Sequence, residues 1–513
     1  MDENIKEGAS TQSNSPSPSR GSEEGVRSGY ASTLKSRAAR GFLWGLLNNG
    51  TVQVLGALFG ILILQRLDPS AQGKITKLMV FAGLASVLQE SGFTAALCNL
   101  KERTHRDYNA VFWCQAGIGT VLYLLLFFCA PFIVNYYQDP DLLWLSRFLF
   151  LGFFFSSLGT VQRAYLFIHL MNRQSCIIAI VSQIVSSCVA VAMAWTGFGY
   201  WSLAVQYVLF VLVVALMNWC YSPWRPSLHI DLRPAWRMFG FSSKLLLTNI
   251  VNSLSSNAFG LLLGKYYGDY QAGVYGAARK WTDMSSNTIN GMLIGVAQPV
   301  LSRVVDEEER YRRTFRKMLR FVSFISFPCL LGMGLIAREF LLLVVGEKWS
   351  ESATLLSMLS LYGAIFPLLT LYSQLAISRG RSNINMWSTL CLSLLILVGL
   401  VALKRFGLYV MVVYFIGINV LWLFVWQSIA RRLIGLRWLD ALCDVLPFLL
   451  TSLAVMAFTW WATRPIQNLL LLLLAKVAMA ASLYILIMWI AGAHIMKESI
   501  AYLLKKRTHN YEL

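Results

Sequence analysis

The stretch 275–290, YGAARKWTDMSSNTIN, carries three ionisable side chains in a segment that otherwise resembles a membrane span. Arg279 and Asp283 are four residues apart and Lys280 and Asp283 are three apart, so one helix face can hold all three. The single carboxylate can neutralise only one of the two cations, which leaves a net positive site. A fixed cation facing a cavity suits a phosphate or pyrophosphate, and arginine offers a planar fork for it. We therefore predict that Arg279 and Lys280 bind substrate.

Five side-chain amides extend this candidate site. They are Asn49 and Gln53 in the first predicted span, Asn249 and Asn252 in the seventh, and Asn290 in the eighth. Such groups could contact the hydroxyls of a sugar. They could equally hold helices together, as polar residues do within membranes, and both interpretations stay open.

Two carboxylates are candidates for coupling to an ion. Glu90 lies in the second predicted span, in LQESGF, and Asp283 lies beside the two cations. A carboxylate within a membrane can carry a coupling proton or pair with a cation. The alternative for Glu90 is a place at the membrane interface. For the Arg279–Asp283 pair, the alternative is that the pair extends to the outer membrane interface through the long arginine side chain.

The composition is that of a helical membrane protein. The chain has 513 residues, of which 57% are hydrophobic and 13% charged. A soluble protein would carry about 25% charged residues. The net charge of +19 fits the excess of basic residues in cytoplasmic loops, so we expect no nucleic-acid partner. The nine cysteines form no CxxC pair, and the sequence predicts no metal site, disulfide framework or cofactor.

Hydropathy predicts an all-α fold of about 14 membrane-spanning helices, each near the ~20 residues that a bilayer requires. The predicted spans are 41–66, 75–98, 109–135, 142–163, 175–195, 198–220, 241–264, 271–301, 317–344, 352–376, 384–403, 407–430, 441–462 and 467–493.

The distribution of basic residues predicts the orientation. Lys35, Arg37 and Arg40 precede the first span, and the even-numbered links are richer in Lys and Arg than the odd ones. Both termini are therefore expected in the cytoplasm. The first tail, 1–38, is rich in Ser, Gly and Pro and is expected to be disordered, and no signal peptide is visible in it. The last tail is 497–513.

The sequence repeats itself weakly at an offset of 200 residues. The matched positions include Asn49 and Asn249, Gly60 and Gly260, and Gly73 and Gly273. Six spans separate the two copies, so both enter the membrane in the same direction. We expect two six-helix lobes, 41–220 and 239–430, around a central cavity, followed by two C-terminal helices in 441–496. The second lobe alone carries the charges, because Met79, Val80 and Gly83 stand opposite Arg279, Lys280 and Asp283.

Signatures of catalysis are missing from the sequence. It contains no GK[ST] phosphate loop, HExxH or GxSxG motif, and no external link is large enough to hold an active site. We expect a protein that is not an enzyme.

Three passages carry a resemblance to a known family. They are GFLWGLLNNGTVQVLGALFGILILQRLDPSAQG, YGAARKWTDMSSNTINGMLIGVAQPVLSR and FPCLLGMGLIAREFLLLVVGEKW. The chain resembles, over about 41–430, the polysaccharide transporter family. These are the Wzx-like flippases of the multidrug/oligosaccharidyl-lipid/polysaccharide exporter superfamily. It is most similar to the branch that includes colanic-acid and lipopolysaccharide exporters.

The resemblance implies a flippase of the bacterial inner membrane. Such proteins move undecaprenyl-pyrophosphate-linked oligosaccharides, the units of O-antigen, capsule or exopolysaccharide, by alternating access. The implied partners are the lipid-linked oligosaccharide, the bilayer and, as a further candidate, the polysaccharide polymerase machinery. Related peptidoglycan-precursor flippases carry cavity arginines in the first, second and eighth spans. Here Arg279 and Lys280 match the eighth-span position alone, and Asn49, Gln53 and Glu90 stand in the other two spans.

Three alternatives remain beside the flippase. An ion-coupled multidrug exporter of the same superfamily would favour an acidic cavity, whereas the predicted one is net basic. A polysaccharide polymerase or ligase would need a large periplasmic loop. A non-catalytic membrane protein of envelope assembly is compatible with the sequence.

Overall fold

The structure, a computed structural model, describes residues 50–90, 97, 103–228 and 231–490, with the side chains of 90, 234–248 and 299 left out. Throughout these residues the regular elements are helices, which confirms the all-α prediction. The long helices are Gly50–Leu64, α2 (Pro69–Glu90), α4 (His105–Tyr137), α5 (Leu142–Ile168), α6 (Asn172–Trp195), α7 (Tyr200–Tyr221), α8 (Arg233–Tyr266), α9 (Gly268–Arg303), α10 (Glu308–Val344), α11 (Ser350–Ser378), α12 (Ser382–Leu403), α13 (Leu408–Ile434), α14 (Trp438–Ala462) and α15 (Leu469–Ile490).

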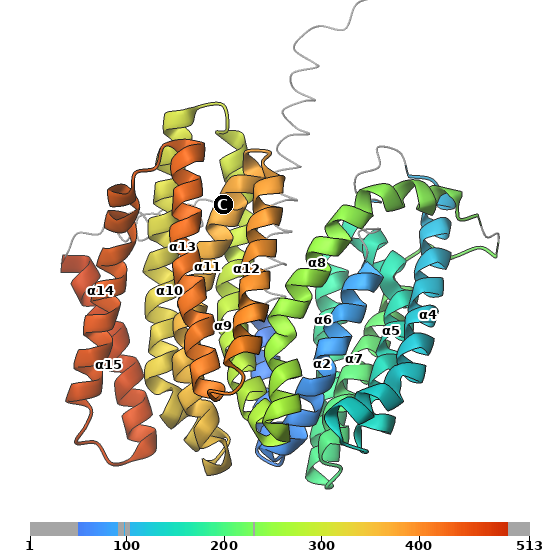
Figure 1. The fold of residues 1–513 in the computed structure, drawn as a ribbon, viewed down its shortest axis with the longest axis horizontal. Coiled ribbons are helices and arrows are strands. Elements are labelled where there is room, and N and C mark those ends of the chain that lie inside the picture. The colour runs from blue at the N-terminus through green and yellow to red at the C-terminus, as the bar shows by residue number, and fades with distance from the viewer. Residues whose placement is uncertain (1–49, 91–96, 98–102, 229–230, 491–513) are drawn as a thin grey trace, which may run out of the picture.

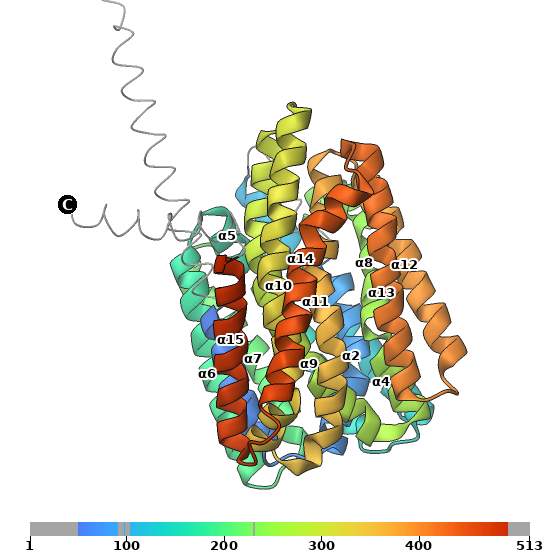
Figure 2. The same ribbon diagram turned by 90° about the vertical axis from the view of Figure 1, so that its left-hand side faces the viewer.

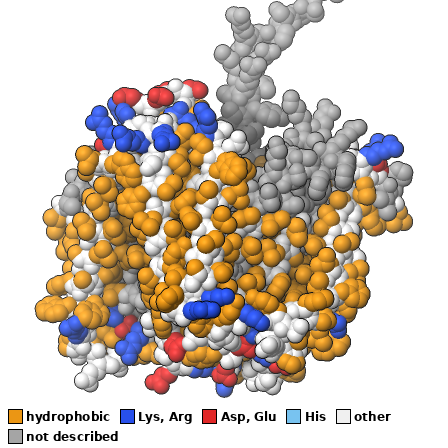
Figure 3. Space-filling model, in the orientation of Figure 1, with side chains coloured by type: hydrophobic (Ala, Val, Ile, Leu, Met, Phe, Trp, Pro, Cys, Tyr) orange, Lys and Arg blue, Asp and Glu red, His pale blue; other side chains and the backbone are white. Residues whose placement is uncertain are grey.

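Each of the 14 predicted spans overlaps one of these helices, although residues 41–49, 91–96, 98 and 491–493 of those spans lie outside the described residues. Ten helices are long and apolar enough to cross a membrane, so the chain is a multi-pass membrane protein. An apolar surface covers the middle of the molecule, and charged side chains gather at its two ends (Figure 3). The helices α2, α8 and α9 fall outside the ten because they are more polar. They form the wall between the two halves of the molecule, where a lipid-facing apolar surface is not needed.

In Figure 1 α2 and α4–α7 lie on one side of the molecule and α9–α15 on the other, and α8 lies at the boundary, where it packs against both α2 and α12. We call Gly50–Leu64, α2 and α4–α7 the N-terminal lobe, and α8–α13 the C-terminal lobe. Each lobe has a core of its own, around Phe150 and Phe153 in the first and around Tyr311 and Phe315 in the second. The lobes contact each other through α2, which packs against both α8 and α9.

The lobes contact at one end, where the turns after Leu64, Tyr137, Tyr266 and Val344 lie; we call it the closed end. Here Gly73 lies against the carbonyl of Asp269, and Gly273 lies against the carbonyl of Pro69. A Cβ atom at either glycine would collide with that backbone, so the helices pack at the closest possible distance.

These contacts are reciprocal at the 200-residue offset. Residue 73 meets 269 while residue 273 meets 69. Deeper in the molecule, Gly60 lies beside Lys280 while Gly260 lies beside Val80. Reciprocal pairs of this kind are what a two-fold axis between two copies produces. The sequence repeat therefore has a structural counterpart at the contact between the lobes.

The two C-terminal helices, α14 and α15, pack against α10 (Figure 2), and ion pairs fix them there. Lys476 of α15 lies 2.7 Å from Glu339, and both side chains are buried. Arg316 and Arg320 hold Asp444 of α14 at 2.6 and 3.1 Å. Because a buried charge left without its partner is strongly destabilising, these pairs specify where α14 and α15 pack.

We predict that Gly273→Ala weakens the contact between the lobes. In a helix alanine is favoured over glycine by up to about 1 kcal/mol, but here its methyl group would meet the Pro69 carbonyl. We expect the substitution to destabilise the protein by about 1–3 kcal/mol, as overpacking does. Thermal unfolding of the purified protein would show this as a lower apparent Tm.

The matched control is Gly417→Ala in α13, where the added methyl group has open space. It should leave the apparent Tm unchanged or raise it. If both variants had the same Tm, the close approach at Gly273 would not stabilise the structure.

Candidate functional site

The predicted cluster on α9 divides into two parts. Successive residues of an α-helix point about 100° apart, so Arg279 and Lys280 face different neighbours. The structure directs Arg279 into the C-terminal lobe and Lys280 towards the N-terminal lobe. The two cations therefore do not form the single positive face that their spacing allowed, because each contacts a different lobe.

Arg279 is held within the C-terminal lobe. Its Nε lies 2.8 Å from Asp283 Oδ1, and its guanidinium stands 5.0 Å from the centre of the Tyr362 ring and 5.6 Å from that of Phe415. The carboxylate neutralises the cation, and the two aromatic rings stabilise its charge further. Arg279 and Asp283 therefore form a neutral pair, and Asp283 is the more exposed of the two side chains, at 42% against 20%.

Lys280 lies in the contact between the lobes. Its Nζ is 3.2 Å from the point that a Cβ atom of Gly60 would occupy, so the ammonium group reaches across to the helix Gly50–Leu64. Within the described part of the chain no carboxylate forms an ion pair with it. Along the axis of α9, Lys280 lies about 18 Å from Gly268, the first residue of the helix, at 1.5 Å per residue. A half-buried ammonium at this depth can bind an anionic group that enters between the lobes.

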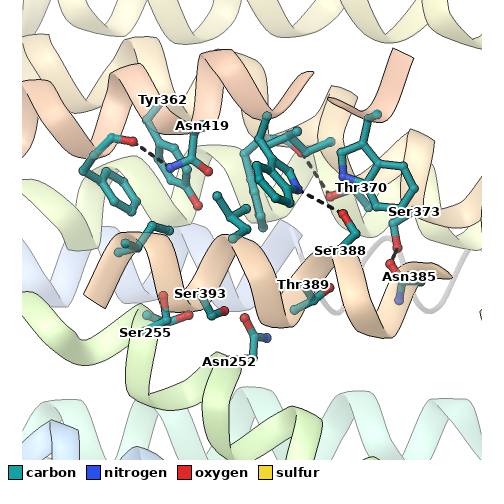
Figure 4. A pocket seen from close by; sticks show the side chains of 18 of the residues that line it. Asn252, Ser255, Tyr362, Thr370, Ser373, Asn385, Ser388, Thr389, Ser393 and Asn419 are labelled. Atoms are coloured by element: carbon teal, nitrogen blue, oxygen red, sulfur yellow. Dashed lines mark hydrogen bonds between the residues drawn. The ribbon is translucent and has the colours of Figure 1, made fainter. Parts of the chain in front are cut away.

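A pocket of about 370 Å³ lies beside Arg279 and is lined by α8, α9, α11, α12 and α13 (Figure 4). Its lining combines aromatic rings with amides and hydroxyls. The residues that line it are Asn252, Ser255, Ser256, Arg279, Tyr362, Phe366, Leu369, Thr370, Ser373, Asn385, Ser388, Thr389, Leu392, Ser393, Ile396, Phe415, Asn419, Trp422 and Trp426.

The closed end contains a second cluster of charges. The ammonium of Lys77 in α2 pairs with Asp269 of α9 and lies 3.6 Å from Asp139, and its side chain is only 3% exposed. Asp269 belongs to the C-terminal lobe and Asp139 to the N-terminal lobe. Lys77 therefore joins the lobes through a buried ion pair. The sequence analysis did not identify Lys77 as a candidate residue.

The remaining predicted site residues lie on several helices. Asn252 is exposed and lines the pocket, Asn249 is exposed, and Gln53 is half-buried. Asn290 is buried, and both atoms of its amide lack a hydrogen-bond partner within the described residues. Asn49 and the side chain of Glu90 lie outside the described residues.

The sequence analysis missed most of the pocket. Asn385, Thr389 and Ser393 follow one another at intervals of four in an apolar span, and Asn419, Trp422 and Trp426 share one face of the next helix. Polar residues at helical spacing within an apolar span were the available signal. The spacing does not reveal that the two faces meet, because that depends on how α12 and α13 pack.

We predict that Lys77→Met loosens the closed end. The substitution leaves Asp269 and Asp139 without their cation, and removing one partner of a buried pair destabilises by about 3–5 kcal/mol. The apparent Tm should fall. The double variant Lys77→Met/Asp269→Asn should be more stable than Lys77→Met, because one uncompensated charge is gone.

The surface variant Lys404→Met, which removes an ammonium that binds the Tyr266 hydroxyl, should leave the Tm unchanged. Additive effects of Lys77→Met and Asp269→Asn would mean that the two charges do not interact.

Comparison with known proteins places the chain among proteins of polysaccharide synthesis. The teichuronic acid biosynthesis protein TuaB of Bacillus subtilis (strain 168) is 27% identical over 371 residues, which cover 70% of this chain and 72% of that protein. The lipopolysaccharide biosynthesis protein WzxC of Escherichia coli (strain K12) is 26% identical over 361 residues, 69% of this chain and 72% of that one.

A solved structure shares the fold. The lipid II flippase MurJ, in its inward closed conformation, superposes with a TM-score of 0.74 over 89% of this chain and 100% of that one, at 12% sequence identity. This likeness concerns the arrangement of the helices. Residues 63–354, more than half of the chain, match the model of a family described as polysaccharide biosynthesis protein. The chain belongs to this polysaccharide biosynthesis protein family.

Proposed function

We propose that the protein is a flippase that moves undecaprenyl-pyrophosphate-linked oligosaccharide across the bacterial inner membrane by alternating access. The observation that carries this proposal is the place of Lys280, a half-buried ammonium between two lobes that touch at one end. Family membership supports it, since the relatives' names refer to the synthesis of teichuronic acid and lipopolysaccharide. The protein acts as a transporter and not as an enzyme.

Lys280 binds the pyrophosphate. Transfer of a doubly charged group through hydrocarbon is prohibitive unless fixed cations replace its hydration. An ammonium is a compact point charge with three donors that suits a phosphate oxygen. Arg279 contributes less to this step than the sequence analysis predicted, because Asp283 neutralises it.

The contact between the lobes acts as the gate. The closed end faces the periplasm, both termini face the cytoplasm, and substrate enters from the opposite end. Transport requires that the Lys77 ion pairs and the contacts at Gly73 and Gly273 separate while the other end closes. The repeat then supplies two rigid units, 41–220 and 239–430, that rock against each other, with 441–496 attached to the second.

Asp283 and Glu90 are the proposed ion-coupling residues. Asp283 is partly exposed and holds Arg279, so its protonation would free the guanidinium for another partner. Coupling to an ion gradient requires that binding of the ion changes the interactions of the transport site, and protonation of Asp283 would change those of Arg279.

We predict that Lys280→Met slows translocation. In proteoliposomes that contain a fluorescent polyprenyl-pyrophosphate-linked oligosaccharide, the initial rate should fall at least tenfold, since loss of one charge-assisted hydrogen bond is worth about 1.5–3 kcal/mol. Lys280→Arg should retain part of the rate because it keeps the charge.

The control is Lys404→Met, which removes the same kind of group at the surface. A wild-type rate in Lys280→Met would contradict the assignment of Lys280. A wild-type protein that moves no lipid-linked glycan but exports cationic drugs would contradict the proposed function.

A further inference from the structure

The pocket in the C-terminal lobe is large for a space between packed helices. Protein interiors leave few voids larger than a water molecule. This one has a volume of about 370 Å³, within the range of about 300–1,000 Å³ that is typical of ligand pockets. It opens beside Asn252 and Ser256, both of which are exposed on α8.

One wall of the pocket is a polar stripe on α12. Asn385, Thr389 and Ser393 recur every fourth residue and so lie along one face (Figure 4). From the first to the last the stripe spans about 12 Å at 1.5 Å per residue. Its hydroxyl and amide groups extend over a length greater than the diameter of a small polar ligand such as water or ammonium.

The facing wall is aromatic. Trp422 and Trp426 of α13, together with Tyr362 and Phe366 of α11, line the same space. Aromatic rings give an apolar surface with a negative face, against which the C–H groups of a sugar ring can stack. A ligand that fits here has apolar faces and polar edges.

The polar groups of the pocket are oriented and retain free capacity. Asn385 Oδ1 accepts a hydrogen bond from Ser373 at 2.7 Å, which leaves its NH₂ group for a ligand. Asn419 donates to the Phe415 carbonyl at 2.7 Å, which leaves its Oδ1 as an acceptor. Ser388 Oγ accepts from Trp422 Nε1 at 3.0 Å and keeps its own hydrogen. The pocket thus offers both donors and acceptors, which hydroxyl groups require.

Charge narrows the class of ligand. Arg279 is the charged residue of the lining, and Asp283 neutralises it. A metal ion would need carboxylate or other anionic ligands, and the lining contains none among the residues that the structure describes. An anion would favour a cation that is not already paired. The remaining class is a neutral molecule rich in hydroxyl or amide groups.

We propose that this pocket binds a sugar residue of the transported glycan. The inference rests on the proposed function and assigns the two halves of the substrate to separate places. Lys280 holds the pyrophosphate between the lobes, and the pocket on the other side of α9 holds a neutral sugar ring. Arg279 stands at the boundary, and its Nη groups donate to the sugar. The pocket therefore selects which glycan the protein accepts.

The test compares two lipids that bind to the full-length protein in nanodiscs. One is undecaprenyl pyrophosphate without sugar. The other is the lipid-linked oligosaccharide extracted from the source strain. The wild-type protein should bind the glycan-bearing lipid at least tenfold more tightly. Asn385→Leu and Thr389→Val, which remove polar groups at similar volume, should reduce that advantage at least fivefold and leave the affinity for the bare lipid unchanged.

A second pair of variants tests the space itself. Ser393→Phe fills the pocket and should abolish the advantage of the glycan-bearing lipid, whereas Ser393→Ala should preserve it. Equal binding of the two lipids by the wild-type protein would overturn the proposed sugar site while flipping remained intact. So would an equal loss for both lipids in Asn385→Leu. Failure of the wild-type protein to flip either lipid would instead contradict the proposed function.

Discussion

The rest of the structure depends on the backbone contact between α2 and α9 at the closed end. Gly73 and Gly273 allow each helix to rest on a carbonyl of the other lobe, with no side chain between them. This contact fixes the distance between the lobes and so places Lys280 beside Gly60. It also buries Lys77 against Asp269, since the ion pair forms only when the helices are this close. The close packing at these glycines thus determines where the charges of Lys77, Asp269 and Lys280 lie in the contact between the lobes.

A membrane protein can place polar groups only where lipid does not reach. In this chain polar groups lie on α2, α8 and α9, on the pocket-facing sides of α12 and α13, and in the ion pairs that join α10 to α14 and α15. The first three helices form the contact between the lobes, and α12 and α13 line the pocket together with α8, α9 and α11. α8 and α9 are poor membrane spans by composition because they are polar, and these two helices line both the contact between the lobes and the pocket. The apolar helices outside them provide the surface towards the bilayer.

The sequence was sufficient for the number of helices, because each span needs a fixed length of apolar residues. It also revealed the repeat, since Gly60, Gly73 and their partners 200 residues later are constrained by the same close approach. It was insufficient for the site. Spacing allowed Arg279, Lys280 and Asp283 to share a face, but the neighbours of α9 decide which side chain turns inward. The pocket combines five helices, and one-dimensional periodicity does not show which faces meet.

The two copies of the repeat differ in charge, because Lys280 of the second copy corresponds to Val80 of the first. At one related position Gly60 leaves room for the ammonium of Lys280, and at the other Gly260 packs against the methyl groups of Val80. Two cations at these positions would repel each other across a narrow contact of low dielectric constant. With one cation, the apolar side can close tightly while the charged side stays available to an anion. The two lobes are therefore related by a two-fold axis in their backbone but not in their charge. The C-terminal lobe carries the cation and also contains the pocket.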